Sequence, residues 1–146
     1  LITTFQKGKA NEFRYEAKRL LLQTAVLSFL FVIVALLLID PLLQWLGKPL
    51  YIEQRGMFPW ILLGTFIFSL SMVPHYALYA QNHDRPIIQS HIASLIVFFP
   101  VTWFFSLHWP YIAIPLGLCV AFFSIALWKS YAFFRLTPAR FYSHQP

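Results

Sequence analysis

Two apolar runs decide the fold: MFPWILLGTFIFSLSMVPHYALYA (residues 57–80) and IIQSHIASLIVFFPVTWFFSLHW (residues 87–109), joined by the polar turn QNHDRP (residues 81–86). Neither run contains Asp, Glu, Lys or Arg, and each exceeds the roughly 18 residues that a helix needs to cross the hydrocarbon core of a membrane. Because lipid offers no partner for backbone N–H and C=O groups, an unbroken apolar run of this length must be helical. The stretch therefore predicts a transmembrane helical hairpin.

The composition assigns the rest of the chain to the same environment. Hydrophobic residues make up 59% of the sequence and charged residues 11%, against roughly 25% charged residues in a soluble domain. The net charge of +6 comes from basic residues that flank the apolar runs, which favours contact with anionic lipid headgroups over contact with nucleic acid. The chain is therefore predicted to be an integral membrane protein.

Two further apolar runs complete an all-α membrane fold of four transmembrane helices. Residues 20–39 carry no charge, and the helix is expected to end at Asp40-Pro41 or to continue to Trp45 as an interfacial anchor. The last run ends at Lys129, which is taken as the point where the chain leaves the membrane. The predicted spans are 20–45, 57–80, 87–107 and 110–129, between a cytoplasmic segment, 1–19, and a cytoplasmic tail, 130–146. Residues 1–19 read like a loop, so the chain is expected to be a fragment of a longer protein.

The distribution of Lys and Arg predicts the orientation. With four spans, nine of the eleven basic residues share one side of the membrane: five in residues 1–19, Arg85 in the middle turn, and three from Lys129 onward. Lys48 and Arg55 lie on the opposite side. Cytoplasmic loops carry the excess of Lys and Arg, so both termini and the turn 81–86 are expected to be cytoplasmic.

No pattern of residues indicates catalysis. The sequence lacks an HExxH, a P-loop, a GxSxG and a pair of carboxylates, so neither an enzyme nor a metal or cofactor site is predicted. The polar residues inside the spans form two stripes at helical spacing. One stripe runs from Gly64 through Ser71 and His75 to Tyr79, and the other comprises residues 90, 91 and 94.

These stripes and the turn suggest a polar rim at the cytoplasmic mouth of a cavity for an anionic headgroup. The candidate residues are His75, Gln81, Asn82, His83, Arg85 and His91. The alternative is structural: neutral His, Ser and Gln form hydrogen bonds between helices, worth about 0.6 kcal/mol each. Under the same alternative, Arg85 is a charge that only sets the topology.

The order of these features resembles the C-terminal part of bacterial polysaccharide flippases, in the multidrug and oligosaccharidyl-lipid exporter superfamily. The resemblance rests on EAKRLLL (16–22) before the first span, WLGKPLYIE (45–53) after it, and Asp84-Arg85-Pro86 in the short turn before the two closing spans. It implies a parent with two lobes of helices, of which this chain is the last four helices of the C-terminal lobe. It further implies transport of lipid-pyrophosphate-linked oligosaccharide to the outer leaflet of a bacterial inner membrane by alternating access.

Two other classes fit the same layout. A lobe of a multidrug or cation antiporter shares it, although the spans hold no carboxylate of the kind by which such antiporters resemble one another. A small four-helix membrane protein that acts as a partner subunit is the third possibility. For the transporter classes, the expected partners are membrane lipids at the basic termini and the remaining helices of the parent.

Overall fold

The computed structural model describes residues 1–138, which form helices and no strand. The helices are α1 (Ile2–Gln6), α2 (Ala10–Leu46), α3 (Pro49–Glu53), α4 (Phe58–Tyr79), α5 (Asp84–His108) and α6 (Ala113–Leu136), with 3-10 turns η1 (Gln54–Met57) and η2 (Pro110–Ile112). Four helical segments are long and apolar enough to cross a membrane: Ala10–Leu46, Pro49–Tyr79, Asp84–His108 and Pro110–Leu136. This confirms the predicted all-α fold with four segments of spanning length.

The helix ends differ from the prediction in several places. The first 19 residues are not a loop, because α1 and the first turns of α2 occupy them. The first span does not close at Pro41, which lies inside α2, and the expected continuation to Trp45 is confirmed because α2 reaches Leu46. An interior proline removes one helical hydrogen bond but does not end this helix. The third span begins at Asp84 rather than at residue 87, where an acidic side chain favours a helix N-terminus.

The most consequential difference lies in the fourth span. Lys129 does not mark the end of the helix, since α6 continues to Leu136. The side chain of Lys129 is fully buried between helices. Of the predicted tail, residues 139–146, with Arg140, lie outside the described residues.

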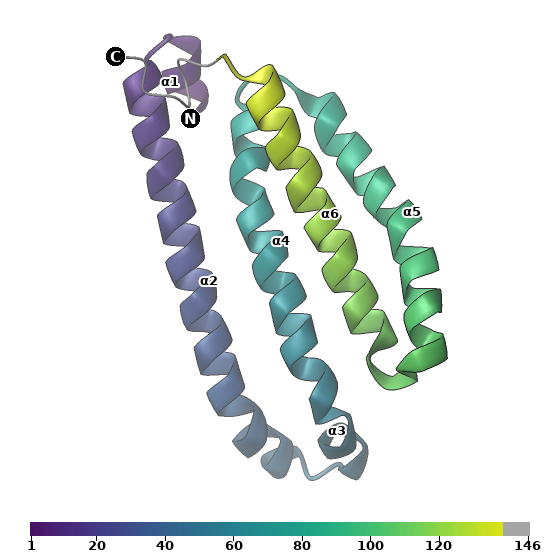
Figure 1. Cartoon of the computed structure of the whole chain (residues 1–146). Coiled ribbons are helices and arrows are strands. Elements are labelled where there is room, and N and C mark those ends of the chain that lie inside the picture. The colour runs from purple at the N-terminus through teal and green to yellow at the C-terminus, as the bar shows by residue number, and fades with distance from the viewer. Residues whose placement is uncertain (139–146) are drawn as a thin grey trace.

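The four long helices lie side by side in the order α2, α4, α6, α5 (Figure 1). Helix α6 therefore separates α4 from α5, although the short turn 80–83 joins those two helices directly. The N-terminus, this turn and the end of α6 share one end of the bundle, which we call the basic end (Figure 1). Helix α3 and the connection between α5 and α6 lie at the opposite end (Figure 1).

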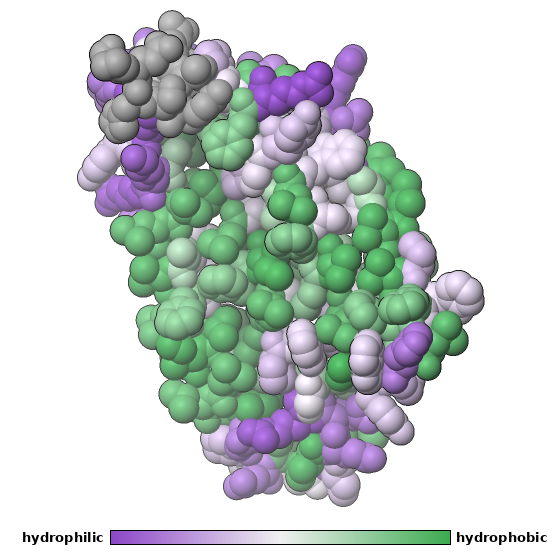
Figure 2. Space-filling model, in the orientation of Figure 1, coloured by the Kyte–Doolittle hydropathy of each residue, from purple (hydrophilic) through white to green (hydrophobic). Residues whose placement is uncertain are grey.

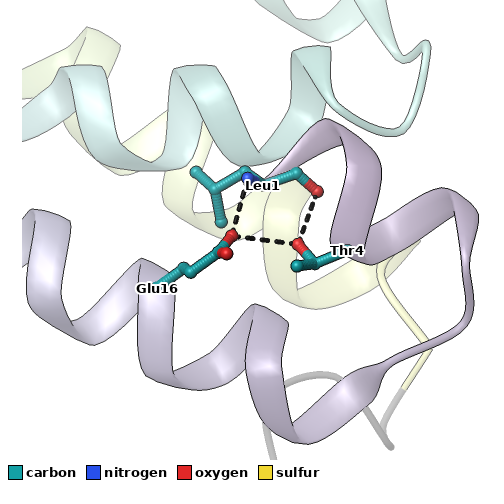
Figure 3. Close-up of polar contacts among 3 residues, drawn as sticks. All are labelled: Leu1, Thr4 and Glu16. Carbon is teal, nitrogen blue, oxygen red and sulfur yellow. Dashed lines mark hydrogen bonds and ion pairs between the residues drawn. The ribbon is translucent and has the colours of Figure 1, made fainter.

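At the basic end, α1 folds back against the start of α2. The Thr4 hydroxyl donates to the Glu16 carboxylate (3.0 Å), and the amino group of Leu1 lies 2.7 Å from the same oxygen (Figure 3). The fully buried ring of Phe13 packs with Ala77 and Ala80 of the α4 end. These contacts position the start of α2 beside α4.

At the opposite end, an ion pair connects α2 to η1. Arg55 contacts Asp40 through Nε (2.5 Å) and through a second nitrogen (2.6 Å), which is the forked geometry of the stronger Arg–carboxylate pairs. Helix α2 ends at Gly47, whose φ of 64° is left-handed and readily adopted by glycine. Two charges of the predicted outer region are thus paired with each other.

The outer surface of the bundle is mainly apolar between two polar ends. Figure 2 shows apolar side chains gathered over the middle of the visible face, with hydrophilic side chains at both ends. Most of the apolar side chains along α2 are exposed, Leu37 at 71% among them. Such a band suits contact with lipid or with further helices.

Candidate functional site

The six residues predicted to form one rim have different environments. Asn82 and Arg85 are exposed, His83 is partly exposed, and His91 is exposed on α5. Asn82 has a positive φ of 59°, as expected for a tight turn residue. The insertion of α6 between α4 and α5 prevents a continuous ring, so only part of the predicted set comes together. A role for these residues in substrate binding stays a prediction.

Gln81 forms an interhelical hydrogen-bonded pair. It is buried, and its amide nitrogen donates to the Thr137 hydroxyl (2.8 Å), which donates in turn to the Gln81 oxygen (3.1 Å). The same nitrogen also donates to the carbonyl of Ala77 (2.9 Å). Gln81 therefore holds the end of α6 against the end of α4, as the structural alternative for this residue predicts.

His75 contacts Lys129, a residue expected from the sequence to mark the membrane exit of the fourth span. Nζ of Lys129 lies 3.1 Å from Nδ1 of His75. Lys129 has no exposed surface, and it forms no ion pair with a carboxylate among residues 1–138. The stripe from Gly64 to His75 does face protein, whereas Tyr79 at its end is 54% exposed.

His91 and Asp84 complete the electrostatic surroundings of this contact. The charge of Lys129 acts on both His75 and His91, and Asp84 acts on His75. Lys129 of α6 thus lies among groups of α4 and α5, which is the region where the sequence predicted a cationic rim. We call His75, His91 and Lys129 the His–Lys cluster.

A cavity of about 430 Å³ lies beside the cluster, between α2, α4 and α6. Arg14 and Lys18 line it from the basic first turns of α2, and the remaining lining residues are mostly apolar. Its lining residues are Arg14, Ala17, Lys18, Leu21, Leu70, Ser71, Val73, Pro74, Ala77, Ala126, Ser130, Phe133 and Phe134. We call it the α2–α4–α6 cavity.

The cavity combines two kinds of chemistry. Arg14 and Lys18 are one helical turn apart, so their cationic groups can meet the same anion. In the same cavity, side chains such as Val73 and Phe134 form an apolar wall. This arrangement suits an amphiphile with an acidic headgroup and a hydrocarbon body. Among residues 1–138, no group of three or more His, Cys, Asp or Glu side chains could hold a metal ion.

Three residues of this region were missed as site residues in the sequence. A charge after a long apolar run, such as Lys129, is typical of the end of a membrane span. The sequence beyond it, Tyr131–Leu136, is again mostly apolar, and this pattern indicates that the helix continues past Lys129. Arg14 and Lys18 were counted only as topology charges. Their spacing of four residues predicts one helical face once the segment is recognised as helical.

No known protein family, no curated protein and no solved structure matches this chain.

Proposed function

We propose that this chain is part of a membrane transporter that carries lipid-pyrophosphate-linked oligosaccharide from the inner to the outer leaflet of a bacterial inner membrane. The observation that carries the proposal is the α2–α4–α6 cavity, with Arg14 and Lys18 beside apolar walls. A lipid pyrophosphate has the matching chemistry, because it joins a dense anion to a hydrocarbon chain.

The two basic residues have complementary roles in this proposal. The guanidinium of Arg14 offers a planar fork that can bind two phosphate oxygens at once, whereas the ammonium of Lys18 acts as a compact charge. The hydrocarbon chain lies along α2, whose exposed apolar side chains continue away from the basic end. Alternating access is supplied together with the remaining helices of the parent.

A second candidate is a lobe of an ion-driven multidrug or cation antiporter. The observation that favours it is the buried Lys129, which has no carboxylate partner within residues 1–138, because ionisable groups inside membrane helices commonly belong to ion or proton pathways. The two candidates differ in the ligand of the α2–α4–α6 cavity. Two basic residues there attract an anionic ligand and repel a cationic drug.

The test is binding of a fluorescent lipid pyrophosphate to the 146-residue chain in lipid nanodiscs. The double substitution Arg14→Gln with Lys18→Gln should weaken binding about tenfold or more, since loss of charge-assisted hydrogen bonds of about 1.5–3 kcal/mol changes affinity on that scale. The lipid alcohol without the pyrophosphate should bind weakly to every variant. In cells, the same double substitution should lower export of surface polysaccharide at unchanged abundance of the protein.

The matched control is Lys7→Gln with Arg19→Gln. This pair removes the same charge from the same end of the bundle, and both side chains are exposed and lie outside the cavity lining. Equal loss of affinity in the two double variants would show a general attraction to the basic end and would contradict a specific site in the cavity.

A further inference from the structure

The contact between His75 and Lys129 limits how many protons the two side chains can hold together. Their nitrogens are 3.1 Å apart, which is a hydrogen-bonding distance. A hydrogen bond between them needs a lone pair, either on the imidazole Nδ1 or on a neutral amine. When Lys129 is an ammonium that donates, Nδ1 of His75 must therefore be unprotonated and the imidazole neutral.

Burial makes the doubly protonated state still less compatible with this geometry. Lys129 is fully buried and has no carboxylate partner among residues 1–138. A second cation at the distance of a hydrogen bond would face the ammonium with no acceptor between them, in surroundings that screen charge poorly. Addition of a proton at Nδ1 therefore removes the only hydrogen bond between these two side chains and replaces it with repulsion.

We propose that Nδ1 of His75 is a proton-binding site, and that binding of one proton there separates His75 from Lys129 and loosens α4 from α6 at the basic end. The ligand is a proton from water at that end of the bundle. No other covalent bond forms or breaks. The contact is present at higher pH, where His75 is neutral, and is lost as the pH falls through the protonation of His75.

The neighbouring charges come from three further sets of groups. His91 of α5 lies near enough for its charge to oppose a proton on His75, whereas Asp84, at the start of α5, favours it. On the side of α2, Arg14 and Lys18 line the adjoining cavity and add positive charge. Cations outnumber the single carboxylate, so the protonated state depends on movement of His75 away from Lys129.

The proton site is connected to the α2–α4–α6 cavity through chain neighbours. Pro74, which precedes His75, and Ser130, which follows Lys129, both line the cavity. Separation of α4 from α6 at this level therefore changes the width of the cavity. A use of the proton to drive transport rests on the proposed function, whereas proton binding by His75 does not.

The experiment measures the distance between α4 and α6 by pulsed electron spin resonance, in nanodiscs without substrate. Nitroxide labels are placed at Tyr79→Cys and Tyr131→Cys, whose native side chains are exposed, in a Cys119→Ala background that removes the single cysteine. Lowering the pH from about 8 to about 5, a range that includes ordinary histidine titration, should lengthen the mean distance. In histidine ¹⁵N spectra at the higher pH, Nδ1 of His75 should be unprotonated.

Two substitutions test the pair directly. In His75→Phe and in Lys129→Met the lengthening on acidification should disappear, because the first variant cannot bind the proton and the second has no cation to repel it. The matched control is His108→Phe, which replaces an exposed histidine at the opposite end and should keep the lengthening. An unchanged distance in the parent chain, a protonated Nδ1 at the higher pH, or a lengthening that persists in His75→Phe would overturn the proposal. No lipid pyrophosphate is present in this experiment, so its result tests proton binding by His75 and does not test the proposed function.

Discussion

At the scale of single residues, the polar side chains within the helices differ in the partners that they find. The hydroxyls of Ser71, Ser90 and Ser94 donate to carbonyls three residues earlier in their own helices, at 2.7–2.8 Å. Gln81 and His75 instead contact residues of another segment. The serine hydroxyls are therefore bonded within their own helices, whereas Gln81 and His75 form polar contacts with another helical segment.

The Gln81–Thr137 pair should contribute measurably to stability. Thr137→Val keeps the shape of the side chain but removes both hydrogen bonds to the buried amide, so we expect a loss of about 1–3 kcal/mol in the free energy of unfolding. The measurement is reversible unfolding in detergent micelles. Thr65→Val is the control, because the Thr65 hydroxyl is exposed and donates only to Ile61 of its own helix.

The pair can be separated from other effects by a double-mutant cycle. The double variant, Gln81→Met with Thr137→Val, should lose less free energy of unfolding than the sum of the two single variants. Each single variant leaves one buried polar group without its partner, whereas the double variant removes both groups. Strictly additive costs would mean that the two side chains do not stabilise each other.

Individual site residues could be predicted only where the local pattern carried the information. His75 belongs to a stripe of small and polar residues, a pattern typical of a helix face that points at protein or at water. In the structure Gly64 and Ser71 of this stripe are buried, whereas Tyr79 at its end is exposed. Its partner Lys129 is 54 residues later in the chain, and nothing in the local sequence says that α6 lies against α4. Contacts of this kind depend on the order in which the helices associate.

At the scale of helices, α5 and α6 pack closely where Gly117 faces Thr102. A Cβ atom on Gly117 would overlap the Thr102 hydroxyl and come within 3.3 Å of the Phe98 ring. The absence of a side chain at Gly117 therefore allows this approach, as small residues commonly do between membrane helices.

Gly117→Ala should destabilise the bundle by about 1–3 kcal/mol, because overpacking forces neighbouring side chains or backbone to move. The measurement is again reversible unfolding in micelles. Gly56→Ala is the matched control, since nothing lies within 4 Å of an added Cβ there. Combining Gly117→Ala with Thr102→Ala should recover part of the loss, and equal effects of the two glycine substitutions would contradict close packing at Gly117.

The existence of the helices was more predictable than their ends. Length and hydropathy identify four apolar runs because each must satisfy its own backbone in lipid. The predicted helix ends were wrong in two kinds of place. In residues 10–19, polar side chains continue the helix beyond the apolar run, and at Lys129 a single charge does not end the helix. A helix accepts charged side chains readily if they can reach solvent or a partner, so charge alone does not end it.

At the scale of the whole molecule, the order α2, α4, α6, α5 decides which residues meet. The short turn between α4 and α5 suggested that these two helices pack together, as sequential elements often do. Instead α6 lies between them (Figure 1), which brings Lys129 to His75 and leaves His91 exposed on the far helix. Helix order is a property of side-chain packing along all four helices, and a short loop constrains it weakly.

The same arrangement makes a prediction about orientation in the membrane. The N-terminus, the turn 80–83 and the end of α6 share the basic end, whereas α3 lies at the opposite end (Figure 1). Lys48 immediately precedes α3 in the chain. Nine of the eleven Lys and Arg residues belong in sequence to residues 1–19, to the turn with Arg85 or to the segment from Lys129 onward. Such an excess of basic residues is characteristic of the cytoplasmic side. A reporter inserted at Asn82 and one fused after Arg140, a residue outside the described range, should therefore both report a cytoplasmic location.

A reporter inserted at Lys48 should report the opposite side. Asn82 and Lys48 are suitable positions because both are exposed and both lie between helices, so an insertion falls outside the long helices. The informative comparison is between Asn82 and Arg140. Opposite locations for these two would require an odd number of crossings after the turn and would exclude the four-span arrangement, whereas a shared external location would keep the arrangement and reverse its orientation. In the reversed case the Arg14 and Lys18 side of the α2–α4–α6 cavity would face away from the cytoplasm, and a substrate assembled inside the cell could not be captured there.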